Sequence, residues 1–160
     1  MLPAGALSVE VQALDRRSLW SLARDPSVLA TAPSIPIKLI APKRVEQVAP
    51  AAADDVLWGL EAVQADTSPF SGAGVVVAVL DTGIDASHAA FAGVEIVQRD
   101  FTGEGNGDAH GHGTHVAGTI FGRNIGGKRI GVASGVSKAL IGKVLGNEGG
   151  SSAGIVRAIN

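Results

Sequence analysis

The alternation of apolar and polar residues predicts where short strands and helices lie along the chain. Residues 7–14 (LSVEVQAL) alternate with a period of two, which is typical of a strand. Residues 75–80 (VVVAVL) are continuously apolar, which predicts a strand buried on both faces. A short helix is predicted over residues 15–24 with Asp15 as its N-cap, followed by an extended edge segment rich in proline. Further strands are predicted at 94–101 and 138–145, and helices at 55–64, 114–121 and 153–159.

Strands that alternate with helices predict an α/β fold with a parallel sheet and right-handed crossovers. Six of the prolines fall in the first 50 residues, which predicts two regions, 1–50 and 51–160. Reactive side chains in such sheets gather beyond the carboxyl ends of the strands, where Asp81 follows the most apolar strand. Within the predicted helix 114–121, Gly118 is expected to permit close packing.

The amino-acid composition excludes several classes of protein and of chemistry. Hydrophobic residues make up 46% and charged residues 18% of the chain, as in globular proteins. The net charge of −2 gives no reason to expect a nucleic acid or an anionic membrane as partner, and no apolar run approaches the roughly 20 residues that span a bilayer. The absence of cysteine excludes disulfides, thiol catalysis and Cys-ligated zinc. The first residues (MLPAGALSVEVQ) predict no signal peptide, and the compartment stays undetermined.

Three of the four histidines lie in HGHGTHVAGT, residues 110–119. A metal site is one interpretation, with oxygen and nitrogen ligands from Asp108, His110, His112 and His115. However, His112 and His115 are three residues apart rather than the four that place a ligand pair on one helix face. A polar helix start with inactive histidines is the second. The third is a single general base whose tautomer Asp81 fixes and whose cationic form Asp81 stabilises.

The motifs DTGID (81–85) and HGTHVAGT (112–119) together resemble those of the subtilisin-like serine proteases (peptidase family S8). The resemblance implies a partial subtilisin-like three-layer fold and hydrolysis of peptide bonds in polypeptide substrates. It makes Asp81 the orienting carboxylate and His112 the general base, later the acid. It makes His115 a structural residue and leaves His110 without a role.

The same resemblance places Leu145 in a substrate pocket, and Gly149 and Gly150 on an edge that pairs with extended peptide. A flexible loop explains the two glycines equally well. Residues 22–40 resemble the end of the prosegment that occupies the active-site edge of such proteases, which makes residues 1–50 a small α+β-like prosegment region. Cleavage would then fall within 42–55. A simple N-terminal extension is the alternative.

The family's nucleophilic serine, in a G-T-S motif, does not occur in residues 1–160, and Asn160 is not the family's oxyanion-hole asparagine. Losing such a serine costs about 10⁶ in turnover, as measured in a subtilisin. The chain as given is therefore expected to carry the Asp and His half of a triad and to be inactive. A truncated, protease-like module that binds peptides is the alternative function. No metal or cofactor is predicted, because Ala90 stands where the family's calcium sites have an acidic ligand. Calcium at Asp100, Glu104 and Asp108 is the alternative, which the sequence supports only weakly.

Overall fold

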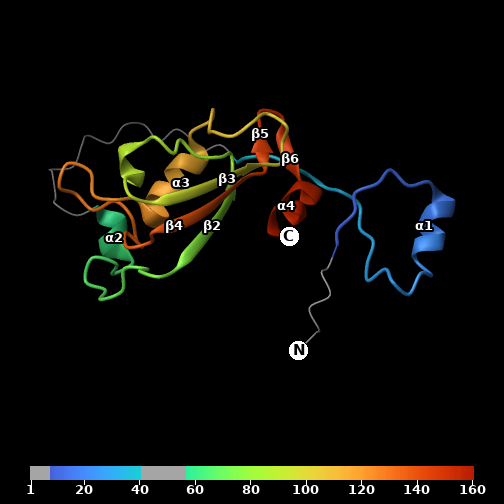
Figure 1. The fold of residues 1–160 in the computed structure, drawn as a ribbon, viewed down its shortest axis with the longest axis horizontal. Helices are drawn as coiled ribbons and strands as arrows, with labels where there is room; N and C mark the ends of the chain where they lie inside the picture. Colours follow the sequence, from blue (N-terminus) through green and yellow to red (C-terminus); the bar gives the residue numbers. More distant parts are fainter. Residues whose placement is uncertain (1–7, 41–56) are drawn as a thin grey trace.

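A parallel sheet forms the centre of the computed structural model, which describes residues 8–40 and 57–160 (Figure 1). The spatial order is β2-β4-β3, with bounds Val76–Asp81 for β2, Lys138–Lys143 for β4 and Glu95–Asp100 for β3. The register pairs both Asp81 and Asp100 with Lys143, so the three carboxyl ends lie side by side. The predicted α/β class with a parallel sheet is confirmed.

Helix α3 (His112–Phe121) packs against one face of this sheet and supplies much of the core. A short 3-10 helix, η1 (Ala89–Phe91), closes the same side. The buried cluster unites both with the strands: Val79, Ile84, Ala90, Phe91, Ala117, Phe121, Val136, Ala139 and Ile141. Helix α4 (Ser152–Ile159) reaches the other face at its carboxyl end, where a Cβ on Gly142 would lie 3.5 Å from that of Ala158.

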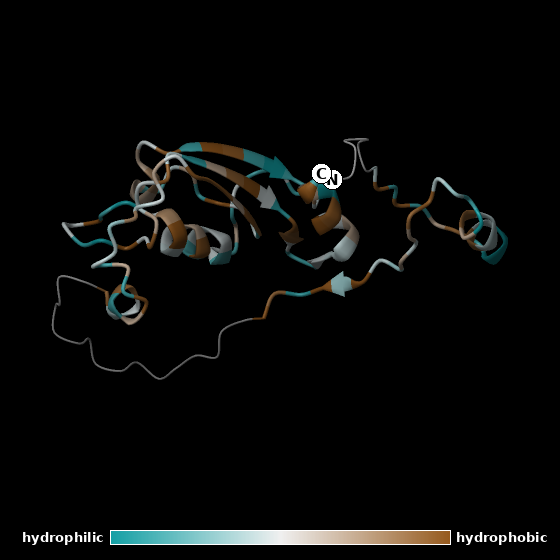
Figure 2. Ribbon diagram, turned by 90° about the horizontal axis from the view of Figure 1, so that it is seen from below, coloured by the Kyte–Doolittle hydropathy of each residue, from teal (hydrophilic) through white to brown (hydrophobic). Residues whose placement is uncertain are grey.

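Burial along the strands differs from the pattern predicted for β2. The apolar run predicts burial on both faces, and this is wrong for the described part of the chain, since Val76 is 53% exposed while Val79 is buried. Among the described residues, only α4 covers the face away from α3, at the carboxyl end of the strands. Hydrophobic residues on the rest of that face, such as Val76, are therefore exposed. Strand β3 alternates exposed and half-buried positions, although its hydrophobic residues form one block between hydrophilic ends (Figure 2).

The N-terminal part contains helix α1 (Arg16–Leu22), whose predicted N-cap is confirmed because Asp15 accepts a 2.7 Å hydrogen bond from the Ser18 amide. Residues 8–14 form no strand, because their alternation finds no partner strand in the described chain. Proline-flanked β1 (Pro36–Ile37) is an edge strand, as predicted.

The remaining elements are short. The predicted helix 55–64 is α2 (Trp58–Ala62), and residues 55–56 lie outside the described part. The predicted strand 138–145 ends at Lys143, and β5 (Leu145–Gly146) and β6 (Gly149–Ser151) form a separate hairpin. No helix in the described ranges has the length and apolar character needed to cross a membrane.

Two glycines of α3 have opposite surroundings. A Cβ on Gly113 would lie 2.2 Å from the Gly83 carbonyl oxygen and 3.2 Å from the Asp81 Cβ. A Cβ on Gly118 would meet no atom of the described residues within 4 Å. The expectation that Gly118 permits close packing is therefore wrong. Gly113 is the residue that lets the helix start lie against the strand tip.

We predict that Gly113→Ala lowers the free energy of unfolding by about 1–3 kcal/mol, because the added methyl displaces the Gly83 backbone. The control on the same helix, Gly118→Ala, is expected to raise it by up to about 1 kcal/mol, through helix propensity. Urea unfolding followed by circular dichroism measures both. Equal effects of the two substitutions would contradict the close approach at Gly113.

Candidate active site at the carboxyl edge of the sheet

An imidazole and a carboxylate meet at the tip of β2. His112 Nδ1 lies 2.7 Å from Asp81 Oδ1, which also accepts a 2.7 Å hydrogen bond from the Thr82 amide. Asp81 is 8% exposed, and the His112 side chain is 32% exposed. A carboxylate at Nδ1 favours the tautomer with the proton on that nitrogen, which leaves Nε2 as the basic nitrogen of the neutral ring. The arrangement is suited to accepting a proton from a neighbouring hydroxyl.

His112 owes its place to the start of α3. Gly111 precedes the helix in the left-handed conformation (φ 88°), so the chain turns sharply into the helix. The helix begins at His112 rather than at the predicted Thr114, which makes His112 its first residue. Gly113 then brings this first turn against the strand tip. Its amide donates a 2.9 Å hydrogen bond to Thr82 Oγ1.

Asp108 ties the strand tip, the loop and the helix start together. Its carboxylate accepts hydrogen bonds from the hydroxyls of Thr82 (2.8 Å) and Thr114 (2.6 Å). It also accepts from the amides of His110 (3.1 Å), Gly111 (2.9 Å) and Thr114 (2.9 Å). All five donors flank His112 or Asp81 in sequence, so Asp108 fixes the backbone on both sides of the pair.

This network changes the acidity of Asp108. Partial burial on its own would raise the pKa of the carboxyl group. The hydrogen bonds from the Thr114 side chain and amide, the Gly111 amide and the Thr82 hydroxyl outweigh that effect and lower the pKa to about 2. The charged form is therefore the one that the folded protein stabilises.

Sequence reasoning did not single out Thr82 or Thr114 as site residues, and it considered Asp108 only as a candidate metal ligand. The signal was present in the sequence, because Asp108 precedes His112 by four residues and Thr114 follows it by two. A carboxylate at that distance from a helix start is well placed to accept from the free amides there.

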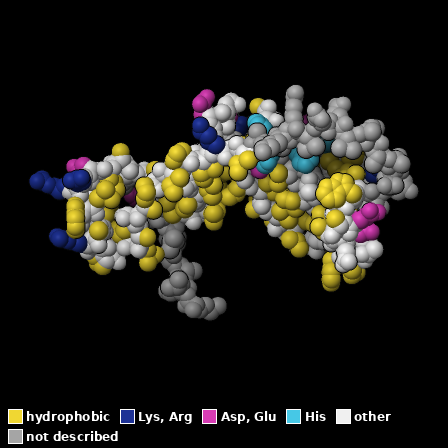
Figure 3. Space-filling view, turned by 180° about the vertical axis from the view of Figure 1, so that it is seen from behind, with side chains coloured by type: hydrophobic (Ala, Val, Ile, Leu, Met, Phe, Trp, Pro, Cys, Tyr) yellow, Lys and Arg dark blue, Asp and Glu magenta, His cyan; other side chains and the backbone are white. Residues whose placement is uncertain are grey.

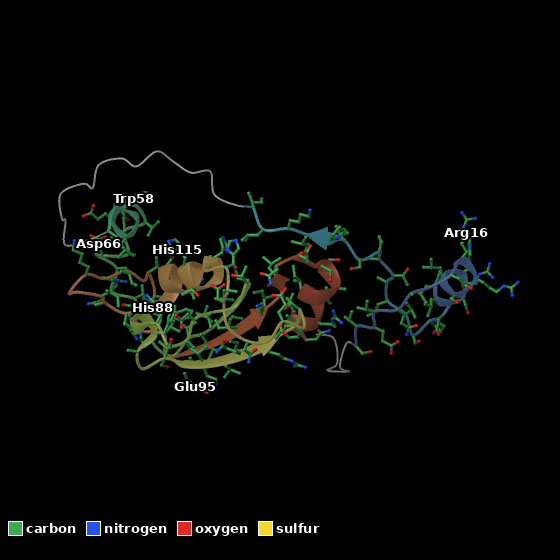
Figure 4. The ribbon with its side chains drawn as sticks, turned by 90° about the horizontal axis from the view of Figure 1, so that it is seen from above. Arg16, Trp58, Asp66, His88, Glu95 and His115 are labelled. Carbon is green, nitrogen blue, oxygen red and sulfur yellow. The ribbon has the colours of Figure 1, made fainter. Side chains whose placement is uncertain are left out.

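The other three histidines lie at different distances from the His112–Asp81 pair. The His110 ring lies with its centroid 6.4 Å from that of His112, whereas His115 is exposed on α3. Histidine side chains gather at one place on the surface seen in Figure 3. His88 lies by η1, away from the strand tips (Figure 4), where its Nδ1 accepts a 3.2 Å hydrogen bond from the Ala90 amide. Across residues 8–40 and 57–160, no group of three His, Cys, Asp or Glu side chains could hold a metal ion.

The residues predicted to bind substrate lie on the β5–β6 hairpin beside this pair. Leu145 is the cross-strand partner of Gly150. The outer edge of β6 pairs antiparallel with β1, with Ile37 opposite Gly150 and Pro36 opposite Ser151. The segment that the sequence leaves open as a flexible loop is therefore a strand with an extended peptide on its edge.

A pocket of about 330 Å³ opens between this hairpin and the His112 loop. The N-terminal segment contributes Lys38 and Leu39 to it. The rest of its lining comes from the strand tips, the loop and the hairpin: Thr82, Glu104, Ala109, His110, Lys143, Leu145, Gly146, Asn147, Glu148 and Gly149.

Fold and site together define a class of α/β protein with an Asp–His pair at the carboxyl edge of a parallel sheet. The model of the subtilase family (peptidase S8) matches residues 72–160, more than half of the chain. The chain belongs to the subtilase family, whose members are serine-type peptidases.

Relatives that match this chain carry the name subtilisin-like protease 6. The protein of Trichophyton rubrum is 41% identical over 92 residues, which cover 57% of this chain and 21% of that protein. The protein of Trichophyton equinum is 39% identical over 111 residues, 64% of this chain and 26% of that protein. The protein of Arthroderma benhamiae is 37% identical over the same length. The chain thus spans about a fifth to a quarter of these relatives.

We predict that Asp108→Asn lowers the free energy of unfolding by about 1–2 kcal/mol at pH 6, because a depressed carboxyl pKa is linked to stability. Since the folded pKa is about 2 and the unfolded value 3.8, the contribution is present above pH 4 and is lost as the pH falls toward 2. Urea titrations of both proteins from pH 6 to pH 2 measure it. A difference that stays constant over this range would show that the charge of Asp108 has no part in it.

Proposed function

We propose that this chain supplies the general base and the orienting carboxylate of a serine endopeptidase. His112 Nε2 takes the proton of an attacking serine hydroxyl and later delivers it to the leaving amine. Asp81 holds the ring through Nδ1 and stabilises the imidazolium that forms. The observation that carries the proposal is the 2.7 Å contact between His112 Nδ1 and Asp81 Oδ1, made by the two motifs of the family.

The nucleophile of this proposal comes from outside the printed sequence. Residues 1–160 contain no G-T-S motif, and the matched relatives are four to five times longer than the aligned region. A polypeptide with these residues and nothing more should therefore not be acylated by a serine-directed reagent. The natural polypeptide, read through its full reading frame, is the protein in which to measure activity.

The N-terminal region is proposed to act as a prosegment, and residues 51–160 as the first part of the catalytic domain. Two contacts support this: the Ser152 amide donates a 2.9 Å hydrogen bond to the Ile35 carbonyl, and Ser152 Oγ accepts one of the same length from the Ile35 amide. With Ile37 opposite Gly150, the segment occupies the edge on which an extended substrate would lie. The proposed cleavage region, 42–55, lies outside the described residues.

The same contacts favour a second candidate, a peptide-binding module without catalysis. An edge strand with glycines binds extended backbone whether or not a serine is present. The two functions differ in turnover. Continuation of the reading frame into a G-T-S motif supports the peptidase, and a stop codon after residue 160 supports the module.

In the natural polypeptide, His112→Ala is expected to abolish peptide hydrolysis, and Asp81→Asn to lower kcat by about 10⁴, as in other serine-protease triads. The reason is that the first removes the base and the second leaves the ring in the wrong tautomer. Steady-state hydrolysis of a chromogenic peptide measures both, with Asp85→Asn as a surface control. Unchanged turnover in His112→Ala would exclude His112 from the mechanism.

A peptide of residues 33–40 is expected to inhibit the mature enzyme competitively. Replacing half-buried Leu39 by alanine in this peptide should raise the inhibition constant about tenfold, since apolar surface in the pocket is lost. The exposed Ser34 provides the control, and its replacement by alanine should leave the constant unchanged. Non-competitive inhibition, or equal effects of the two replacements, would contradict the proposed occupancy.

A further inference from the structure

Glu104 connects the loop after β3 to the β5–β6 hairpin. Its Oε1 accepts a 2.8 Å hydrogen bond from the Asn147 amide at the hairpin turn. Its Oε2 lies 3.2 Å from Lys143 Nζ at the tip of β4. One carboxylate thus joins the central strand of the sheet to the turn that leads into the peptide-binding edge.

The ion pair is partly protected from solvent. Lys143 is 6% exposed, so its ammonium group depends on Glu104 for compensation. The hairpin leaves room for the carboxylate, because a Cβ on Gly146 would lie 2.4 Å from Glu104 Oε1. Any side chain at position 146 would therefore displace Glu104.

The loop that carries Glu104 is itself ordered. The Asp100 carboxylate accepts hydrogen bonds from the amides of Thr102 (2.8 Å), Gly103 (2.9 Å) and Gly105 (2.8 Å). Slight burial raises the pKa of Asp100, and the bonds from Thr102, Gly105 and Gly103 outweigh this and lower it to about 2. Glu104 is thus presented from a loop with its backbone fixed on both sides.

The hairpin held in this way forms one side of the pocket that contains Leu39, and its outer strand pairs with Pro36–Ile37. Glu148 lies in the same turn and lines the same pocket, but has no hydrogen bond or ion pair with the loop in the described part of the chain. Glu104 and Glu148 therefore share charge and pocket but differ in bonding.

We propose that Glu104 is a positioning residue for the peptide-binding edge. It sets the place of the β5–β6 hairpin relative to the sheet, and hence how tightly an extended peptide is held, without touching the reacting atoms. This inference rests on the proposed function of that edge. It predicts a selective effect on peptides long enough to lie along Gly149 and Gly150.

The test compares Glu104→Ala with Glu148→Ala in the natural polypeptide, using one substrate with five residues before the scissile bond and one with two. Glu104→Ala is expected to raise KM for the long substrate about tenfold with kcat unchanged, and to leave KM for the short substrate unchanged. Glu104→Gln keeps an acceptor for the Asn147 amide, so it should bring KM back to within about threefold of the original. Glu148→Ala removes a carboxylate from the same pocket but no bond between the loop and the hairpin, so it should raise KM for the long substrate less than Glu104→Ala does.

Thermal unfolding of each variant separates positioning from loss of fold. If the Glu104→Ala protein does not fold because the charge of Lys143 is no longer compensated, combining it with Lys143→Met removes that charge. The same rise in KM is then expected. A fall in kcat on both substrates, or an equal KM rise in Glu148→Ala, would overturn the proposal.

A binding measurement keeps this inference independent of catalysis. Fluorescence anisotropy of a labelled peptide of residues 33–40 should show about tenfold weaker binding to Glu104→Ala, in protein from which residues 1–50 have been removed by processing. If turnover proves independent of His112 while this difference persists, the proposed catalytic function fails and the positioning role stands. Equal affinities of Glu104→Ala and of the unsubstituted protein for this peptide would refute the role of Glu104.

Discussion

The short contact between His112 and Asp81 is the constraint to which the surrounding structure conforms. A carboxylate that is 8% exposed is costly unless its oxygens are bonded, and Asp81 Oδ1 serves both the Thr82 amide and the imidazole. To bring the ring that close, the first turn of a helix must touch the tip of a strand. The absence of a side chain at Gly113 meets this requirement, because a Cβ there would collide with the Gly83 carbonyl.

Two further carboxylates, both in the segment between β3 and α3, stabilise different parts of the site. Asp108 fastens the backbone on both sides of the His112–Asp81 pair, and Glu104 fastens the hairpin that bears the peptide edge. Both reach their targets from a glycine-rich loop in which Gly103, Gly105, Gly107 and Gly111 have positive φ. A glycine-rich loop loses much conformational entropy when it becomes ordered. The hydrogen bonds to Asp100 and Asp108 offset this loss and hold the loop in one conformation.

Local signals predicted the elements that depend on nearby residues. The cap at Asp15, the parallel strands and the position of Asp81 at a strand tip follow from patterns a few residues long. Only the family resemblance indicated that the N-terminal segment lies on the peptide-binding edge. Local patterns could not show that Pro36–Ile37 pairs with Gly150–Ser151, because this contact joins residues more than 100 positions apart. The alternation in residues 8–14 misled for the same reason, since a period of two specifies a strand only where a partner is present. Likewise, whether Gly113 or Gly118 permits close packing depends on which face of α3 meets the Gly83 backbone.

The pairing of β1 with β6 has a consequence for how the edge becomes available. If the N-terminal region is a prosegment, as proposed, the tethered segment competes with free peptide at an effective concentration in the millimolar range. Substrate at micromolar levels would then be excluded while the tether is intact. The described contacts are few: β1 has two residues, Ile35 makes two hydrogen bonds with Ser152, and half-buried Leu39 lines the pocket. Such a short strand holds its place through the tether more than through its own affinity. Under the proposed prosegment role, cleavage of the connection would remove this effective concentration and the segment would dissociate more readily. A weakly bound, covalently attached strand would then block the edge before cleavage and leave it afterwards.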